Sequence, residues 1–142
     1  MDYRIRRSPD DLESTGFVEI YPWKDSGDSW QHGGLFIRED AFNVAEGIVM
    51  RHQPGFDHLS SNDIPRSVGM AIVADWRSVA DRLPSLSPIE AATELNLDDW
   101  FVEGFLSEFA NHRSEIVAML RDLAQECRQF YGQSKWVCII GM

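Results

Sequence analysis

The chain has 142 residues, the length of one typical domain and enough to bury more than half of its unfolded surface around a single core. Apolar residues make up 44% and charged residues 25%, a balance that excludes an intrinsically disordered chain. The net charge of -10 repels phosphate backbones and anionic membranes, so it disfavours binding to nucleic acid or to a membrane surface. The same charge would attract a basic partner, or it would serve solubility alone.

Cysteine usage and the lack of a targeting segment predict a cytoplasmic protein. Cys127 falls on the apolar stripe of a helix and Cys138 inside an apolar strand, so both are expected to be buried and free rather than paired in a disulfide framework. The stretch from Met1 to Arg7 is polar, and no window approaches the roughly 18 apolar residues of a membrane span. Because no repeat or long linker divides the chain, residues 1–142 are expected to form one domain.

Two strands and a helix are expected in the first third of the chain. Residues 17–21 alternate and are rich in β-branched and aromatic side chains, which predicts a strand that ends at Pro22. Residues 30–37 predict a second strand, bent at Gly33-Gly34, that pairs with the first as an antiparallel hairpin. Residues 38–52 then change to helical spacing, with an apolar face formed by Ala41, Val44, Ala45, Ile48 and Val49.

The middle of the chain fits two patterns. Residues 56–65 are predicted to be a polar loop because they include Ser60-Ser61-Asn62-Asp63. Residues 68–73 alternate as in a strand, whereas the apolar residues from Ile72 to Leu83 have helical spacing. We expect a strand through Val73, followed by a helix over residues 75–83.

The last third predicts three helices and a final strand. Ser87-Pro88-Ile89-Glu90 matches a capping box, so a helix is expected from there to about Leu95. Asn96 or Asp98 then caps a helix whose bulky face is formed by Phe101, Phe105 and Phe109. The longest helix is expected over residues 114–131, with Gly132 just past its end, and the apolar run 135–140 predicts a central strand. Together these elements predict an α+β fold, in which a small mixed or antiparallel sheet of about three to four strands packs against about four to five helices.

Residues that could carry chemistry are present, but they are not spaced as known motifs require. The four histidines and two cysteines lack the short spacings of zinc ligands, and no glycine-rich phosphate loop or nucleophile elbow occurs. We therefore expect no metal and no cofactor. The basic cluster of Arg4, Arg6 and Arg7 is expected to be solvated or to form salt bridges with the acidic surface.

The most unusual segment is the thirty residues from Leu83 to His112, which contain no Lys or Arg but six acidic residues: Glu90, Glu94, Asp98, Asp99, Glu103 and Glu108. Like charges at helical spacing cost a few tenths of a kcal/mol each in helix stability, so their accumulation favours an anionic binding surface. The alternative interpretation is that the aspartates cap a helix and the glutamates only solvate it. A smaller acidic and aromatic group is formed by Asp25, Asp28 and Trp30.

These features favour a non-catalytic protein-binding module, and specifically an immunity or antitoxin-type inhibitor that covers the active site of a basic, nuclease-like toxin. Carboxylates suit that role because sites that attract phosphate also attract carboxylates. The residues expected to bind the partner are Glu90, Glu94, Asp98, Asp99, Trp100 and Glu103, together with Asp25, Asp28 and Trp30. Two alternatives stay open: a secretion chaperone or adaptor, and a small enzyme whose site is assembled around His52, Asp57 and His58.

Overall fold

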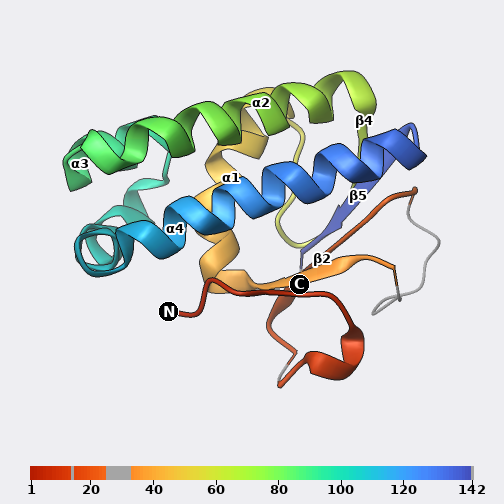
Figure 1. Cartoon of the computed structure of the whole chain (residues 1–142), viewed down its shortest axis with the longest axis horizontal. Coiled ribbons are helices and arrows are strands. Elements are labelled where there is room, and N and C mark those ends of the chain that lie inside the picture. Colours follow the sequence, from red (N-terminus) through yellow and green to blue (C-terminus); the bar gives the residue numbers. More distant parts are fainter. Residues whose placement is uncertain (14, 25–32, 142) are drawn as a thin grey trace.

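The computed structural model describes residues 1–13, 15–24 and 33–141 (Figure 1). The expected α+β class is confirmed, but the sheet has five strands rather than three or four, and all of its strand pairs are antiparallel. The strands follow the spatial order β1-β3-β2-β5-β4 and comprise Ile5–Arg6 (β1), Phe17–Tyr21 (β2), Leu35–Arg38 (β3), Ser61–Pro65 (β4) and Trp136–Ile140 (β5). The described helices are Glu39–His52 (α1), Arg66–Arg82 (α2), Pro88–Glu94 (α3) and Asp99–Gln133 (α4), with 3-10 turns at Pro9–Asp11 (η1) and Leu83–Ser85 (η2).

The centre of the sheet matches the expectation from sequence. β2 and β3 form the predicted antiparallel pair, with Val18 opposite Ile37. β5 lies between β2 and β4, which confirms the predicted central position of this strand. Successive residues of a strand point to opposite faces of the sheet. Every second side chain of a strand therefore packs with the helices in one continuous core, as Ile20, Ile37 and Ile139 do.

The prediction of a polar loop over residues 56–65 is wrong for its second half, which forms β4. Asn62 explains how such a polar segment can pair with β5. Its side chain is only 8% exposed, and its amide donates to the backbone oxygens of Asp57, Ser60 and Ile139. Ile64 also points inward, and Pro65 ends the strand, which is at the edge of the sheet where a proline is tolerated.

The prediction of a strand through Val73 is also wrong, since α2 is one continuous helix from Arg66 to Arg82. The helical spacing decides here, because Ile72, Trp76 and Val79 all face the core. Trp76 is 1% exposed, and its indole N–H donates to the backbone oxygen of Ala45 at 3.0 Å. Near the start of the helix, Gly69 leaves room for the ring of Tyr131, which an added Cβ would strike.

The two helices expected after residue 96 are joined into α4, which has a kink at His112 (φ −129°, ψ 26°). Directly after the kink, the guanidinium of Arg113 donates to the carbonyl oxygens of Leu83 (2.7 Å), Pro84 (3.2 Å) and Leu86 (2.7 Å). It also lies 4.4 Å from the centre of the Phe109 ring. Gly132 falls inside the helix rather than past it, and Ser134 is the C-cap. A short strand, β1, has no counterpart among the predicted elements.

Candidate functional site

The acidic segment of the sequence forms α3, the connection after it and the first half of α4. Within it, half of the carboxylates already have intramolecular partners. Glu90 accepts a hydrogen bond from the backbone N–H of Ser87, which confirms the capping box and lowers the pKa of Glu90. Glu94 forms a 2.7 Å ion pair with Arg82, and Glu108 accepts the Tyr3 hydroxyl hydrogen at 2.9 Å.

The remaining three carboxylates, together with Trp100, form what we call the Trp100 edge: Asp98, Asp99, Trp100 and Glu103. All four are exposed, and the three carboxylates have no ion pair within the part of the chain that the structure describes. Asp98 occupies the N-cap position of α4, but its side chain makes no capping hydrogen bond. The interpretation that it serves as a helix cap is therefore not supported by its contacts.

Trp100 is the most informative residue of this edge because it is 72% exposed, whereas Trp76 is 1% exposed. The inward positions of this part of α4 belong to Phe101, Phe105 and Phe109, which places Trp100 one residue outside the apolar stripe. Its ring meets that of Phe101 edge-on, with centroids 5.5 Å apart and an interplanar angle of 70°. One aromatic contact therefore holds a ring that is otherwise open to solvent.

A shallow cleft adjoins Trp100 and lies between α4 and α1. Its lining includes Asp98, Trp100 and Phe101 from the start of α4, and Glu46 and Met50 from α1. Two close contacts with α1 hold the connection beside it in place. Asn96 adopts a left-handed conformation (φ 55°) and donates a hydrogen bond to the backbone oxygen of Gly47 at 2.9 Å. An added Cβ at Gly47 would collide with the carbonyl oxygens of Leu95 and Asn96, so glycine is needed for this approach.

Next to this cleft, His58 lies between two carboxylates of α1. Its Nδ1 is 2.6 Å from Glu46 and its Nε2 is 2.7 Å from Glu39. Only the imidazolium form can donate from both nitrogens at once. Burial alone would lower the pKa of His58, but the hydrogen bonds to Glu39 and Glu46 outweigh it and raise that pKa. Burial raises the pKa of Glu46, and the nearby charge of Asp98 adds to the effect.

The three residues of the alternative enzyme site are not brought together. Instead, His52 contacts Asp75 on α2 at 2.9 Å. The Asp57 carboxylate accepts the backbone N–H of Leu59 at 2.9 Å and closes a local turn. His58 contacts Glu39 and Glu46, and among the described residues no hydrogen bond or ion pair links any two of the three.

Other chemistry is equally poorly supported in residues 1–13, 15–24 and 33–141. No group of three His, Cys, Asp or Glu side chains that could hold a metal ion is found there. Cys127 and Cys138 are both buried, and neither forms a disulfide, as expected. Burial raises the pKa of Cys127 to about 12, which keeps this thiol protonated and unreactive.

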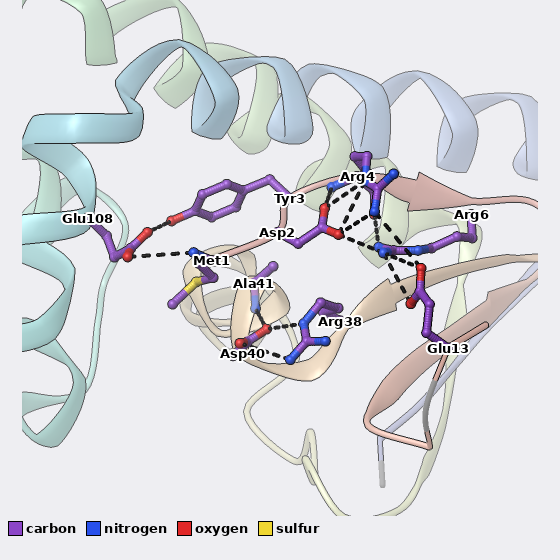
Figure 2. Close-up of polar contacts among 10 residues, drawn as sticks. All are labelled: Met1, Asp2, Tyr3, Arg4, Arg6, Glu13, Arg38, Asp40, Ala41 and Glu108. Carbon is purple, nitrogen blue, oxygen red and sulfur yellow. Dashed lines mark hydrogen bonds and ion pairs between the residues drawn. The ribbon is translucent and has the colours of Figure 1, made fainter. Parts of the chain in front are cut away.

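Arg4 and Arg6, which precede η1, are neutralised within the chain, as Figure 2 shows. Arg6 is 7% exposed and pairs with Asp2 at 2.7 Å and Glu13 at 3.1 Å. Hydrogen bonds from Arg4 and Arg6 lower the pKa of Asp2, although burial opposes them. Arg7 pairs with Glu126 on α4. These contacts confirm the expected salt bridges and leave no free basic cluster at this position.

The second acidic and aromatic group, formed by Asp25, Asp28 and Trp30, lies outside the described residues, as does His32. It stays a prediction. Two features of the described part were missed by sequence reasoning: the contact of His58 with α1, and the contribution of α1 to the cleft. The first had a signal in the sequence, since Glu39 and Glu46 are seven residues apart and share one face of a helix. The contribution of α1 to the cleft depends on the close approach of Gly47 to residues 95–96, which the spacing of residues in the sequence does not reveal.

The comparisons with known proteins add no family. No protein-family model, no curated protein and no solved structure matches this chain. None of the helices in the described ranges is long and apolar enough to cross a membrane. The function must therefore be inferred from the chain's own residues.

Proposed function

We propose that this protein is a non-catalytic binding module whose Trp100 edge engages cationic side chains of a protein partner. The observation that carries the proposal is the 72% exposure of Trp100 beside three carboxylates, Asp98, Asp99 and Glu103, that have no cationic partner among the described residues. An arginine of a partner could pair with a carboxylate and stack on the indole ring at the same time. Trp and Arg are the residues that most often dominate the binding energy of protein interfaces.

The structural support is that this surface is held in place before any partner arrives. Asn96 and Gly47 fix the connection to α1, and Phe101 fixes one side of the Trp100 ring. A preorganised surface loses little conformational freedom on binding, which favours affinity. Glu90 and Glu94 were also expected to bind the partner, but their intramolecular contacts make them weaker candidates than the Trp100 edge.

Within this class we infer an inhibitor of the immunity or antitoxin type, which covers the active site of a basic, nuclease-like toxin. The support is electrostatic. A chain with a net charge of -10 accelerates its encounter with a basic protein, and a site built to bind phosphate accepts carboxylates in its place. Unlike an enzyme, such an inhibitor needs no assembled catalytic group.

The test is capture of partners from the host lysate and from the products of neighbouring genes, at low and high salt. The inhibitor proposal expects a basic partner whose retention falls with salt and whose nuclease activity is blocked by the complex. The variant D98N/D99N/E103Q should lose that partner. The matched control D10N/D11N/D122N removes the same charge from exposed carboxylates elsewhere and should retain it. A partner retained equally by both variants would contradict the Trp100 edge as the binding surface.

The two alternatives, a secretion chaperone or adaptor and a small enzyme, stay predictions without a specific observation in their favour. Capture of an extended apolar segment, insensitive to salt, would support the chaperone alternative. Turnover that is lost on His58→Gln would support the enzyme. Cytoplasmic location likewise stays a prediction.

A further inference from the structure

A second charged surface, of opposite sign, lies on the outer side of α2 and α4. These two helices lie side by side and run in opposite directions, as Figure 1 shows. Between them is an open groove of about 590 Å³, lined by Arg77 and Asp81 of α2 and by Arg121, Gln125, Arg128 and Gln129 of α4. Its size is within the range of ligand-binding clefts, roughly 300–1,000 Å³.

The arginines of this groove differ from the others in the chain. Arg77 and Arg128 have no hydrogen bond, ion pair or ring contact within the described residues, and Arg121 is paired with Asp81 at 3.1 Å. Every other arginine has an intramolecular partner: Arg4, Arg6, Arg7, Arg38, Arg51, Arg66, Arg82 and Arg113. In a chain with 23 acidic side chains, both unpartnered guanidinium groups therefore line one groove.

The acidic side chains of this half of α4 are directed elsewhere. Glu126 pairs with Arg7, and Glu115 and Asp122 line a separate hollow against residues 1–5. Three arginines and one aspartate thus give the groove a local charge of +2, although the whole chain carries -10. Because salt screens exposed charges beyond about 8 Å at physiological ionic strength, a small ligand in the groove responds mainly to these nearby groups.

We propose that the groove between α2 and α4 binds a compact phosphate-bearing ligand. Guanidinium groups match phosphate oxygens with paired hydrogen bonds, and a phosphate carries more charge than a carboxylate. Gln125 and Gln129 provide amides that can donate to or accept from the remainder of the ligand. A long polyanion such as nucleic acid would extend beyond the groove into the acidic field, so a small ligand fits better than a polymer. The groove shares no lining residue with the Trp100 edge, so the inference does not depend on the proposed function.

The experiment follows the arginine side-chain Nε signals by NMR while inorganic phosphate, pyrophosphate, adenosine monophosphate or citrate is added to the full chain. We expect saturable shifts at Arg77, Arg121 and Arg128 with at least one phosphate compound, and binding by citrate that is weaker by roughly tenfold. Inorganic phosphate and the nucleotide distinguish a free phosphate site from one that also contacts a nucleoside. Shifts that do not saturate with any phosphate compound, or citrate binding as tight as the best of them, would overturn the proposal.

Charge-matched variants separate the groove from the general charge of the chain. R77Q/R128Q should weaken binding by roughly tenfold or more, because it removes both unpartnered guanidinium groups. R4Q/R38Q removes the same charge from two arginines outside the groove and should leave the affinity within about twofold. Circular dichroism melting shows that both variants are folded. Equal weakening by the two variants would overturn the proposal.

Discussion

The two halves of α4 lie on either side of the His112 kink and present different charges to solvent. The first half, residues 99–111, carries Asp99, Glu103 and Glu108 with no Lys or Arg, and it displays an exposed Trp. The second half carries acidic and basic residues on separate flanks, with Glu126 toward Arg7 and Arg121 toward α2. Net charge therefore describes neither surface, because a helix separates its charges onto different faces and a kink changes the direction of those faces.

Loss of a buried aromatic residue from the first half of α4 should reduce stability far more than loss of the exposed Trp100. Phe109 is fully buried and stacks on Phe105 at 5.4 Å, so Phe109→Ala should lower the free energy of unfolding by about 3–5 kcal/mol. Trp100→Ala should change it by less than about 1 kcal/mol, because the ring is mostly in water already. Chemical denaturation monitored by circular dichroism measures both. A loss on Trp100→Ala as large as on Phe109→Ala would show that Trp100 belongs to the core.

The next effect concerns the junction between the halves. Arg113 holds three carbonyl oxygens at the end of α2 and η2, so Arg113→Met should cost about 1–3 kcal/mol in unfolding free energy. Arg113→Lys should restore only part of the loss, since an ammonium group lacks the planar fork of a guanidinium. Urea unfolding curves of the three proteins give the comparison. Full stability in the methionine variant would show that the junction does not depend on Arg113.

A smaller effect on stability depends on pH and concerns the charge of His58. The pKa of His58 is raised above its ordinary value of 6.5 by Glu39 and Glu46, despite the opposing effect of burial. A raised pKa in the folded state stabilises the protein fully below the unfolded pKa, and this contribution is lost as pH rises through the folded pKa. The raised pKa of Glu46 acts with the same sign.

We therefore expect the free energy of unfolding to fall as pH rises above 6.5. His58→Gln should flatten this part of the stability curve, and Glu39→Gln should flatten it partly because one carboxylate remains. Denaturant unfolding at a series of pH values measures the slope. An unchanged slope in His58→Gln would mean that another group causes the pH dependence.

The smallest expected effect on stability is at the Trp100 edge. Since Asp98, Asp99 and Glu103 make no ion pair among the described residues, D98N/D99N/E103Q should alter the unfolding free energy by no more than about 0.5 kcal/mol. Thermal melting compared with the control D10N/D11N/D122N checks this. A large loss would show that these carboxylates stabilise the fold rather than serve a partner.

Sequence patterns predicted the parts of the fold where one periodicity dominates. The β2–β3 pair, α1, the Ser87 capping box and the central position of β5 are all confirmed. Sequence patterns failed where tertiary contacts determine the secondary structure. Polar β4 is stabilised by the hydrogen bonds of Asn62, and α2 continues through an alternating stretch because its apolar residues face the core. The two helices expected after residue 96 correspond to the two halves of α4, which meet at the non-helical His112, directly before the expected start of the second helix at Ser114.

For the candidate site, the sequence indicated the acidic segment but not which carboxylates are available. Glu94 is paired with Arg82, twelve residues earlier, a contact that requires α2 to run as far as Arg82. The exposure of Trp100 follows from its position beside the stripe of Phe101, Phe105 and Phe109, so the helical spacing of the sequence was sufficient to predict it. The arginine groove could not be predicted in this way, because it combines residues from α2 and α4 that are far apart in the chain.

The claim that the Trp100 edge receives a partner's cations is tested most directly by the indole N–H signal of Trp100 in NMR spectra. A short arginine-rich peptide is titrated into the full chain at low salt, and the indole N–H signal of Trp76, which is 1% exposed, serves as the internal control. We expect a saturable shift of the Trp100 signal that weakens with added salt and is absent in D98N/D99N/E103Q. A Trp100 signal that does not move, or that moves equally in the variant, would contradict it.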